Sequence, residues 1–213
     1  HGASPIEALR AAIDVFERAI RLNPNFPVLH NNLGLVHNQL AQYHDETGSD
    51  PVPSWNAALA SFERAVELKA DYGAYFNRTL IYAQLAQRQQ GFGRDGSAIA
   101  KKGEAAFAEG LAQNDQVSQA WMFGAWLNVV EARADLAARR SPERSLSRAF
   151  ERIRRGLAVD PSDTNLLDTE VAALMVRAEW NITRGRSPER DFAEGERVLR
   201  RAAIHVMSSE QEA

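Results

Sequence analysis

The chain has 213 residues, of which 45% are hydrophobic and 25% are charged, and its formal net charge is −3. This is an ordinary composition for a soluble protein with a continuous core. The charge balance does not favour a nucleic acid as partner, and the absence of cysteine excludes disulfides and thiolate chemistry. The longest apolar stretch, residues 120–130, is too short to span a bilayer. No secretory signal peptide is visible, so we expect a cytoplasmic protein.

The first predicted element is a helix over residues 5–22. Ala12, Phe16 and Ala19 lie at positions i, i+4 and i+7, which share one face of an α-helix. The two small residues allow another helix to approach closely, and the large residue fills the space between them. Pro24 cannot continue the helix and indicates a turn. This small–large–small frame predicts a helix that packs against a neighbour and then ends.

The same frame returns along the chain at intervals of 45 or 46 residues, and such a regular recurrence indicates a repeat array. The later copies are Ala58, Phe62 and Ala65; Gly103, Phe107 and Gly110; Ala149, Ile153 and Gly156; and Gly195, Leu199 and Ala202.

Each full repeat is predicted to contain two helices, a first-type helix and then a second-type helix that carries the frame. We expect first-type helices at 26–44, 71–90, 116–138 and 162–183, and second-type helices at 56–70, 99–114, 145–159 and 191–208. They form one predicted repeat domain over 1–213, with a half unit at 5–24 and full units at 25–70, 71–115, 116–161 and 162–208.

The second-type helices resemble those of the tetratricopeptide repeat (TPR), which has small, aromatic, small and proline sites in its second helix. The slots of its first-helix motif, W-x-x-L-G-x-x-Y, are filled more loosely. They hold His30, Leu33, Gly34 and His37; Trp121, Gly124, Ala125 and Asn128; and Leu167, Glu170, Val171 and Leu174, and the second unit is ambiguous around 76–83. This resemblance implies an all-α fold, a right-handed α-solenoid of antiparallel helix pairs, here with a period of about 46 residues rather than about 34.

The extra residues of each unit form inserts rich in Gly, Pro, Ser and charge, which are loop signals. They lie at 46–54, 93–98, 139–145 and 184–191. Arrays with such inserts are similar to the TPR regions appended to large bacterial serine/threonine protein kinases. That resemblance covers an accessory module and includes no kinase motif.

The helix at 5–22 has no first-type helix before it, so its apolar face (Ile13, Phe16 and Ile20) should be partly uncovered. Two alternatives follow. Either the array continues before this sequence, or another chain covers the face, in which case the helix mediates self-association.

Three histidines, His30, His37 and His44, lie along one stripe of the next predicted helix. Seven residues of helix correspond to about 10.5 Å, so no two of them can share a metal ion without outside ligands. We interpret them as packing or surface residues and predict neither a metal nor a cofactor.

Other chemical motifs are weaker still. The sequence GFGRDG at 91–96 matches G-x-G-x-x-G, but a helix rather than a strand is predicted before it. Glu170 occupies a slot that is usually apolar, and we expect it to reach solvent or an arginine such as Arg177. Four arginines of one helix form a basic stripe, which we interpret as a solvated face with ion pairs, the alternative being a site for an acidic partner. They are Arg144, Arg148, Arg152 and Arg155.

The TPR resemblance implies a concave groove lined by the first-type helices. By position, the predicted peptide-binding residues are Asn31, Leu35, Asn38, Asn77, Arg78, Ile81, Met122, Trp126 and Asp168. Asparagine can hydrogen-bond an extended peptide backbone, and Trp and Met make adaptable apolar contacts. The alternative is that Met122 and Trp126 are buried by a neighbouring helix. The lysines of the family's carboxylate clamp are absent.

These observations lead to three hypotheses. The first is a non-catalytic module that binds a protein or peptide, as the docking or sensory region of a bacterial signalling kinase. The second is a structural or oligomerisation scaffold that associates through the N-terminal helix. The third is an enzyme or small-molecule sensor that uses the groove around Trp126. No catalytic residue can be nominated, because neither a nucleophile–base pair nor paired carboxylates stand out.

Overall fold

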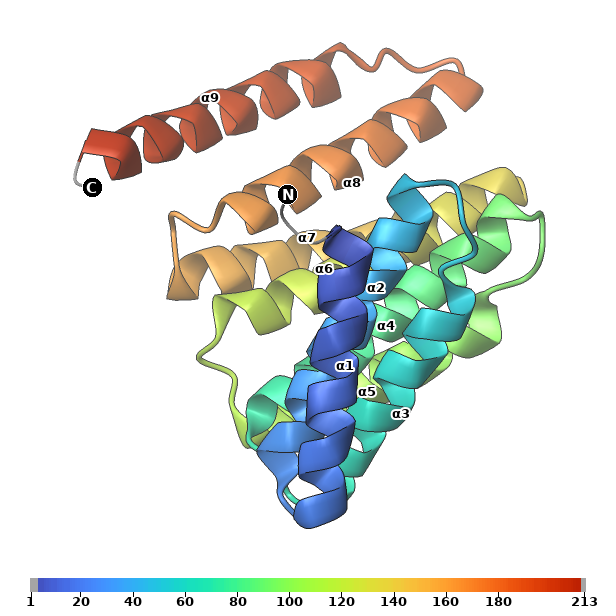
Figure 1. Cartoon of the computed structure of the whole chain (residues 1–213). Coiled ribbons are helices and arrows are strands. Elements are labelled where there is room, and N and C mark those ends of the chain that lie inside the picture. The colour runs from blue at the N-terminus through green and yellow to red at the C-terminus, as the bar shows by residue number, and fades with distance from the viewer. Residues whose placement is uncertain (1–3, 212–213) are drawn as a thin grey trace. The chain divides into compact units, whose positions relative to one another are not determined.

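A computed structural model describes residues 4–211 of the chain, with side chains as far as Ile204, and within this range every regular element is an α-helix (Figure 1). The helices confirm the predicted order and lie within a few residues of the predicted bounds. They are α1 (Pro5–Leu22), α2 (Pro27–Glu46), α3 (Val52–Glu67), α4 (Tyr72–Gly91), α5 (Ser97–Gln113), α6 (Ser118–Ala137), α7 (Glu143–Val159), α8 (Thr164–Thr183) and α9 (Glu189–Gln211).

Local sequence explains where several helices begin and end. The Ser4 backbone N–H donates to Glu7 in a capping box at the start of α1. Asp163 caps α8 by accepting from two backbone N–H groups. After α4 and α8 the chain turns through Gly93 and Gly185, whose φ angles of 69° and 68° lie in the left-handed region that favours glycine. The predicted inserts overlap the loops after α2, α4, α6 and α8, but their last residues already belong to the helices that follow, which begin at Val52, Ser97, Glu143 and Glu189.

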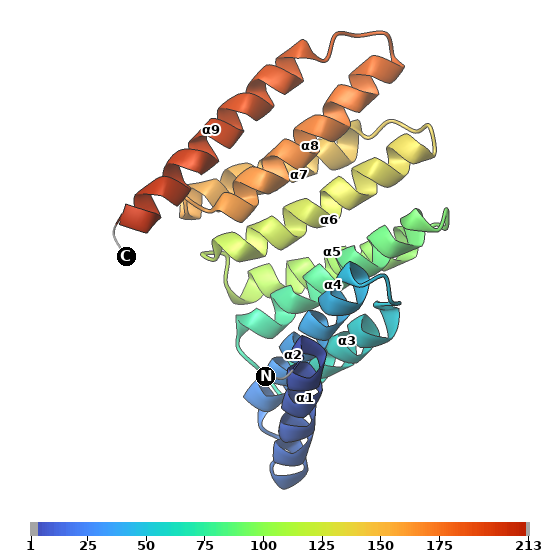
Figure 2. The same ribbon diagram turned by 45° about the horizontal axis from the view of Figure 1, so that its top comes forward.

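The chain divides into two compact units, residues 1–81 (unit 1) and 82–213 (unit 2), and α4 runs through the boundary. Within unit 1, α2 packs against both α1 and α3. Within unit 2, α6 packs against α5, α7 and α8, and α8 packs against α7 and α9. Figure 2 shows α6, α8 and α9 running side by side in this unit.

The small–large–small frames explain this packing. Phe62, Phe107 and Ile153, their central residues in α3, α5 and α7, are at most 3% exposed. A Cβ atom at Gly34 would lie only 2.6 Å from Phe62 Cε1, so the ring of Phe62 occupies the space that glycine leaves open. Two frames are exceptions. Helix α1 has no buried residue, and its Phe16 is only partly covered. The apolar face of α1 is thus partly uncovered, as predicted. In α9 the central residue of the frame, Leu199, is 50% exposed, so this copy was wrongly predicted to bury its large side chain.

Between residues 4 and 211 no helix combines the length and apolar character needed to cross a membrane. The chain is an all-α, helical-repeat-like protein.

Candidate functional site

The predicted groove residues of unit 1 are mostly engaged in packing. Asn77 Nδ2 donates to Asn31 Oδ1 at 3.2 Å, so these two amides, 46 residues apart, bind each other. Ile81 has no exposed surface, which makes it a core residue without access to a ligand. Asn38 is also buried, and its Oδ1 has no hydrogen-bond partner among the described residues. Only Leu35, at 40%, is clearly exposed.

Arg78, the remaining predicted residue of unit 1, is half-buried. Its guanidinium lies 5.5 Å from the centre of the Tyr75 ring. This cation–π contact holds the side chain of Arg78 against its own helix.

In unit 2 the predicted residues Met122 and Trp126 are half-buried and pack against the core around Val129 and Leu166. Asp168 is exposed. None of these three residues lines the hollows described below. The sequence left open whether Met122 and Trp126 line a groove or are buried by a neighbouring helix, and their half-burial lies between these two alternatives.

One hollow of unit 2 lies further along the same helices. It has a volume of about 610 Å³ and is lined by Arg133, Leu136 and Ala137 of α6, by Met175, Val176, Ala178, Glu179 and Ile182 of α8, and by Phe192 of α9. We call it the α6–α8–α9 groove.

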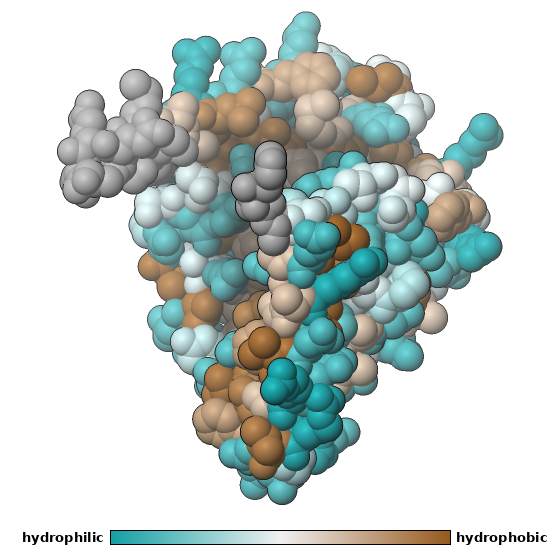
Figure 3. All heavy atoms as spheres, in the orientation of Figure 1, coloured by the Kyte–Doolittle hydropathy of each residue, from teal (hydrophilic) through white to brown (hydrophobic). Residues whose placement is uncertain are grey.

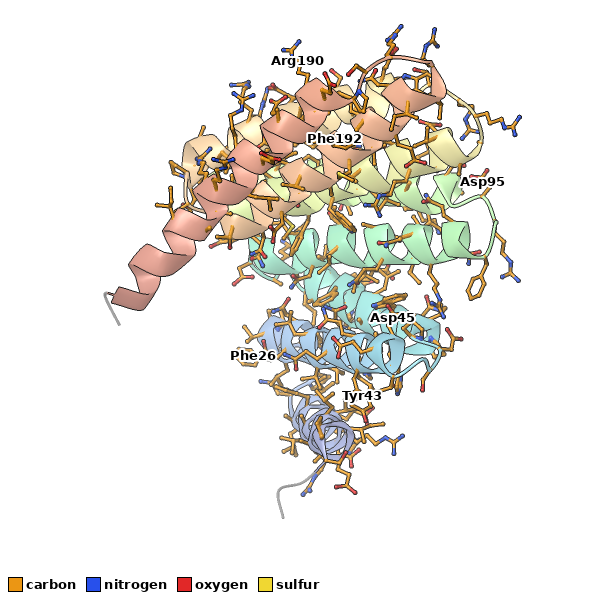
Figure 4. All side chains as sticks on the ribbon, turned by 90° about the horizontal axis from the view of Figure 1, so that it is seen from above. Phe26, Tyr43, Asp45, Asp95, Arg190 and Phe192 are labelled. Atoms are coloured by element: carbon orange, nitrogen blue, oxygen red, sulfur yellow. The ribbon has the colours of Figure 1, made fainter. Side chains whose placement is uncertain are left out.

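Exposed apolar side chains distinguish the groove. Met175, Ile182 and Phe192 are 53%, 55% and 44% exposed. Met175, Glu179 and Ile182 follow each other at i, i+4 and i+7, so they form one stripe of α8. Leu174, which precedes Met175 and lies about a quarter turn away around α8, is buried. In Figure 4 Phe192 lies over the neighbouring ribbons, whereas Arg190, two residues earlier, points away from them.

A second hollow of about 460 Å³ adjoins the groove at Leu136. Its other lining residues are Arg139, Trp180, Thr183 and Arg184. The Arg184 guanidinium lies 5.2 Å from the centre of the Trp180 ring, and Trp180 Nε1 donates to Glu143 at 3.4 Å. We refer to this hollow as the Trp180 pocket.

The charges around the two hollows are unequal. Arg133, Arg139 and Arg184 line them, and Glu179 is the only acidic side chain among the lining residues. None of the three guanidinium groups forms an ion pair within the described part of the chain. Arg133 instead lies 5.7 Å from the centre of the Trp126 ring. The site is therefore apolar in the middle and basic at its edge.

The predicted basic stripe of α7 needs a correction, because two of its arginines point inward. Arg152 makes two hydrogen bonds to the Glu104 carboxylate, at 2.7 and 3.0 Å, and its side chain is only 13% exposed. Arg148 donates to Glu131 at 2.7 Å. Asn128, which is fully buried, donates to both carboxylates. These five residues form a partly buried polar network that joins α5, α6 and α7.

The two carboxylates of this network differ in pKa. Burial opposes ionisation of Glu104, but the hydrogen bonds and charge of Arg152, with Asn128 and Arg148, outweigh it and lower its pKa. At Glu131 burial dominates, and Asn128 and Arg148 only partly offset it, so its pKa is raised. The outer arginines of the stripe behave as predicted for a solvated face: Arg144 is exposed, and Arg155 pairs with Glu151 at 2.7 Å.

Glu170 is half-buried rather than solvated. Burial raises its pKa and nearby Glu194 raises it further, while Arg201 and Arg177 act in the opposite sense. Arg177, the predicted partner, binds Asp191 at 2.7 Å and Glu194 at 2.9 Å instead.

The histidine stripe and the glycine motif have structural explanations. His30 Nε2 hydrogen-bonds to the Pro24 carbonyl at 2.9 Å, and His44 Nδ1 hydrogen-bonds to Ser54 at 3.3 Å. Burial lowers the pKa of His37, although Glu17 partly counteracts it. The motif at 91–96 begins with the last residue of helix α4 and does not follow a strand. In the part of the chain that the structure describes, no cluster of His, Asp or Glu could hold a metal ion.

No protein-family model matches the sequence, and no curated protein or solved structure is significantly similar to it. The function of the chain is therefore inferred from its own residues.

Proposed function

We propose that the chain is a non-catalytic, TPR-like repeat module that binds a protein or peptide through the α6–α8–α9 groove. The observation that carries this proposal is the set of exposed apolar side chains that line one hollow, Met175, Ile182 and Phe192. Apolar residues gathered in a hollow with a polar edge are typical of interaction sites, because burying them against a partner releases water from both surfaces.

The composition of the groove favours a peptide over a small metabolite. Its volume of about 610 Å³ is bordered by Arg133 and Glu179, and it continues into the Trp180 pocket through Leu136. An elongated partner can place successive side chains along such a surface. Trp126, the centre of the third hypothesis, a small-molecule sensor or enzyme, is not among the lining residues of either hollow.

The repeat period and the inserts support a wider proposal. Helix pairs that recur every 45 or 46 residues are compatible with a right-handed α-solenoid. The style of the inserts supports a role as the docking or sensory region of a bacterial signalling kinase in the cytoplasm.

Selection from a random peptide library displayed on phage tests the proposed groove. The parent chain is compared with the double variant Met175→Glu/Ile182→Glu, which places two charges in the groove. Leu199→Glu is the matched control, because Leu199 of α9 is 50% exposed and lies outside the groove. Circular dichroism checks that all three proteins remain helical.

We expect selected peptides to bind the parent and Leu199→Glu, and to bind the groove variant at least about tenfold more weakly, a loss of about 1.4 kcal/mol. Undiminished binding to the groove variant would place the peptide elsewhere. A selection that enriches no peptide would count against a peptide-binding function.

A second candidate function is self-association through α1. Val15 and Leu22 of this helix are 62% and 89% exposed, and Phe26, just after it, is 47% exposed. Figure 3 shows hydrophobic atoms gathered along one side of α1 and towards its C-terminal end. Sedimentation velocity of the parent and of Val15→Glu/Leu22→Glu tests this candidate. A parent that stays monomeric at high concentration would eliminate it.

A further inference from the structure

We infer that the partner of the α6–α8–α9 groove is an acidic protein segment with apolar side chains, and that Arg133, Arg139 and Arg184 bind its side-chain carboxylates. This inference rests on the proposed function and specifies the chemistry of the partner.

The first argument is local charge. The chain as a whole carries a net charge of −3. The groove and the Trp180 pocket together are lined by three arginines and one glutamate, and Glu143 accepts a hydrogen bond from Trp180 beside them, so the net charge around them is positive, opposite in sign to that of the chain. A basic site attracts acidic partners by charge complementarity.

The second argument is the pairing of arginines within unit 2. Arg140, Arg152 and Arg177 each bind a carboxylate of the chain at 3.0 Å or less. Arg133 and Arg184 have no such partner and instead lie over Trp126 and Trp180. An arginine that rests on an aromatic ring still presents its N–H groups at the edge of the guanidinium, where a carboxylate can accept two hydrogen bonds.

The third argument concerns the backbone near the Trp180 pocket. Helices α6 and α8 end here, at Ala137 and Thr183. The C-terminal ends of helices carry free carbonyl groups and the negative end of the helix dipole, which stabilise cations and disfavour an anion unless cationic side chains offset them. Arg184 follows Thr183 directly and Arg139 lies two residues after Ala137, so a carboxylate at this place has to be held by these two side chains.

The single acidic lining residue predicts the order of side chains in the partner. Glu179 lies between Met175 and Ile182 on α8. A neutral or basic residue should contact this part of the groove, while the acidic residues contact the arginines. Because recognition uses side-chain carboxylates, the partner does not need a free C-terminus.

Fluorescence anisotropy with synthetic peptides tests the inference. Three fluorescein-labelled peptides of equal length share the same leucines and an amidated C-terminus, and carry Glu, Gln or Lys at the remaining positions. The double variant Arg139→Glu/Arg184→Glu reverses the charge of the Trp180 pocket. Arg190→Glu is the matched control, because Arg190 is exposed and points away from the helices in Figure 4.

We expect the Glu peptide to bind about tenfold more tightly than the Gln peptide, and the Lys peptide to bind most weakly. This preference should fall with added salt, disappear in Arg139→Glu/Arg184→Glu, and persist in Arg190→Glu. Equal binding of the Glu and Gln peptides, or equal effects of the two charge reversals, would overturn the inference.

The inference and the proposed function fail in different ways. If all three peptides bind equally and Met175→Glu/Ile182→Glu abolishes their binding, the groove binds peptides but does not select acidic ones. If no peptide binds and the library selection is empty as well, the proposed function fails.

Discussion

Gly124 of α6 lies directly against the ring of Phe107 from α5, and this contact allows a quantitative prediction. A Cβ atom at Gly124 would lie 2.5 Å from Cε2 and 2.7 Å from Cζ of Phe107. The ring has little freedom to move, because Trp121 packs against it edge-on at 5.7 Å and the Arg152 guanidinium lies 4.1 Å from its centre. The substitution Gly124→Ala should therefore overpack the interface between α5 and α6.

Two opposing effects set the magnitude. Overpacking a tight core costs about 1–3 kcal/mol, whereas alanine is favoured over glycine inside a helix by about 1 kcal/mol. We expect Gly124→Ala to lower the free energy of unfolding by about 1 kcal/mol. Gly195, inside α9, is a matched control, because nothing lies within 4 Å of the position of its Cβ. Gly195→Ala should raise the free energy of unfolding by about 1 kcal/mol.

Urea denaturation followed by circular dichroism measures both variants against the parent chain. The same chemical change should then give opposite signs at the two sites, a difference of about 2 kcal/mol. Replacing the ring of Phe107 with the smaller leucine side chain should relieve the overlap. The double variant Gly124→Ala/Phe107→Leu should therefore lose less stability than the two single variants combined. If Gly124→Ala is as stable as Gly195→Ala, the close contact does not constrain the fold and the reasoning is wrong.

Three further predictions concern polar groups. Glu104→Gln should destabilise the fold by about 2 kcal/mol at neutral pH. Because the pKa of Glu104 is lowered in the folded state, the parent loses this advantage over the variant as the pH falls through that pKa. Glu170→Gln should stabilise the fold at neutral pH, because the raised pKa of Glu170 means that its ionised form is disfavoured in the folded state. The gain should vanish below the ordinary pKa of 4.5, where the carboxyl group is protonated in both the folded and the unfolded chain. A variant less stable than the parent at neutral pH would contradict this assignment. A double-mutant cycle of Asn31→Ala and Asn77→Ala should give a coupling of about 0.5–1.5 kcal/mol, measured by urea denaturation, whereas additive losses would show that their hydrogen bond contributes nothing.

Much of the fold follows from local sequence patterns. Helical spacing, the inserts and Pro24 indicated helices in the order that the structure shows. The frames also predicted which side of α3, α5 and α7 is buried, since an apolar side chain at i+4 between small residues is stabilised only when another helix covers it. The uncovered face of α1 followed from the same periodicity, because a repeat helix without its neighbour lacks the surface that would bury Phe16.

The candidate site depended on contacts between residues far apart in the chain. Asn31 and Asn77 were predicted to face a ligand, but they bind each other, and Ile81 is enclosed. Arg148 and Arg152 were predicted on a solvated face, yet they bind the carboxylates of Glu131 and Glu104, and Asn128 donates to Glu104 as well. Periodicity cannot anticipate such pairs, because the partners belong to different helices and the cost of burying each charge depends on the other.

The sequence by itself therefore determined the helices, their order and the apolar face of most of them, because these properties depend on residues within one or two turns. Only the tertiary structure decided which first-type helices leave a hollow between them. Met175, Ile182 and Phe192 come together because α8 packs against both α6 and α9. Arg133, Arg139 and Arg184 then border the groove and the adjoining Trp180 pocket from three separate positions in the chain. A site assembled from several helices has no single pattern in the chain, and its chemistry exists only after the helices have packed.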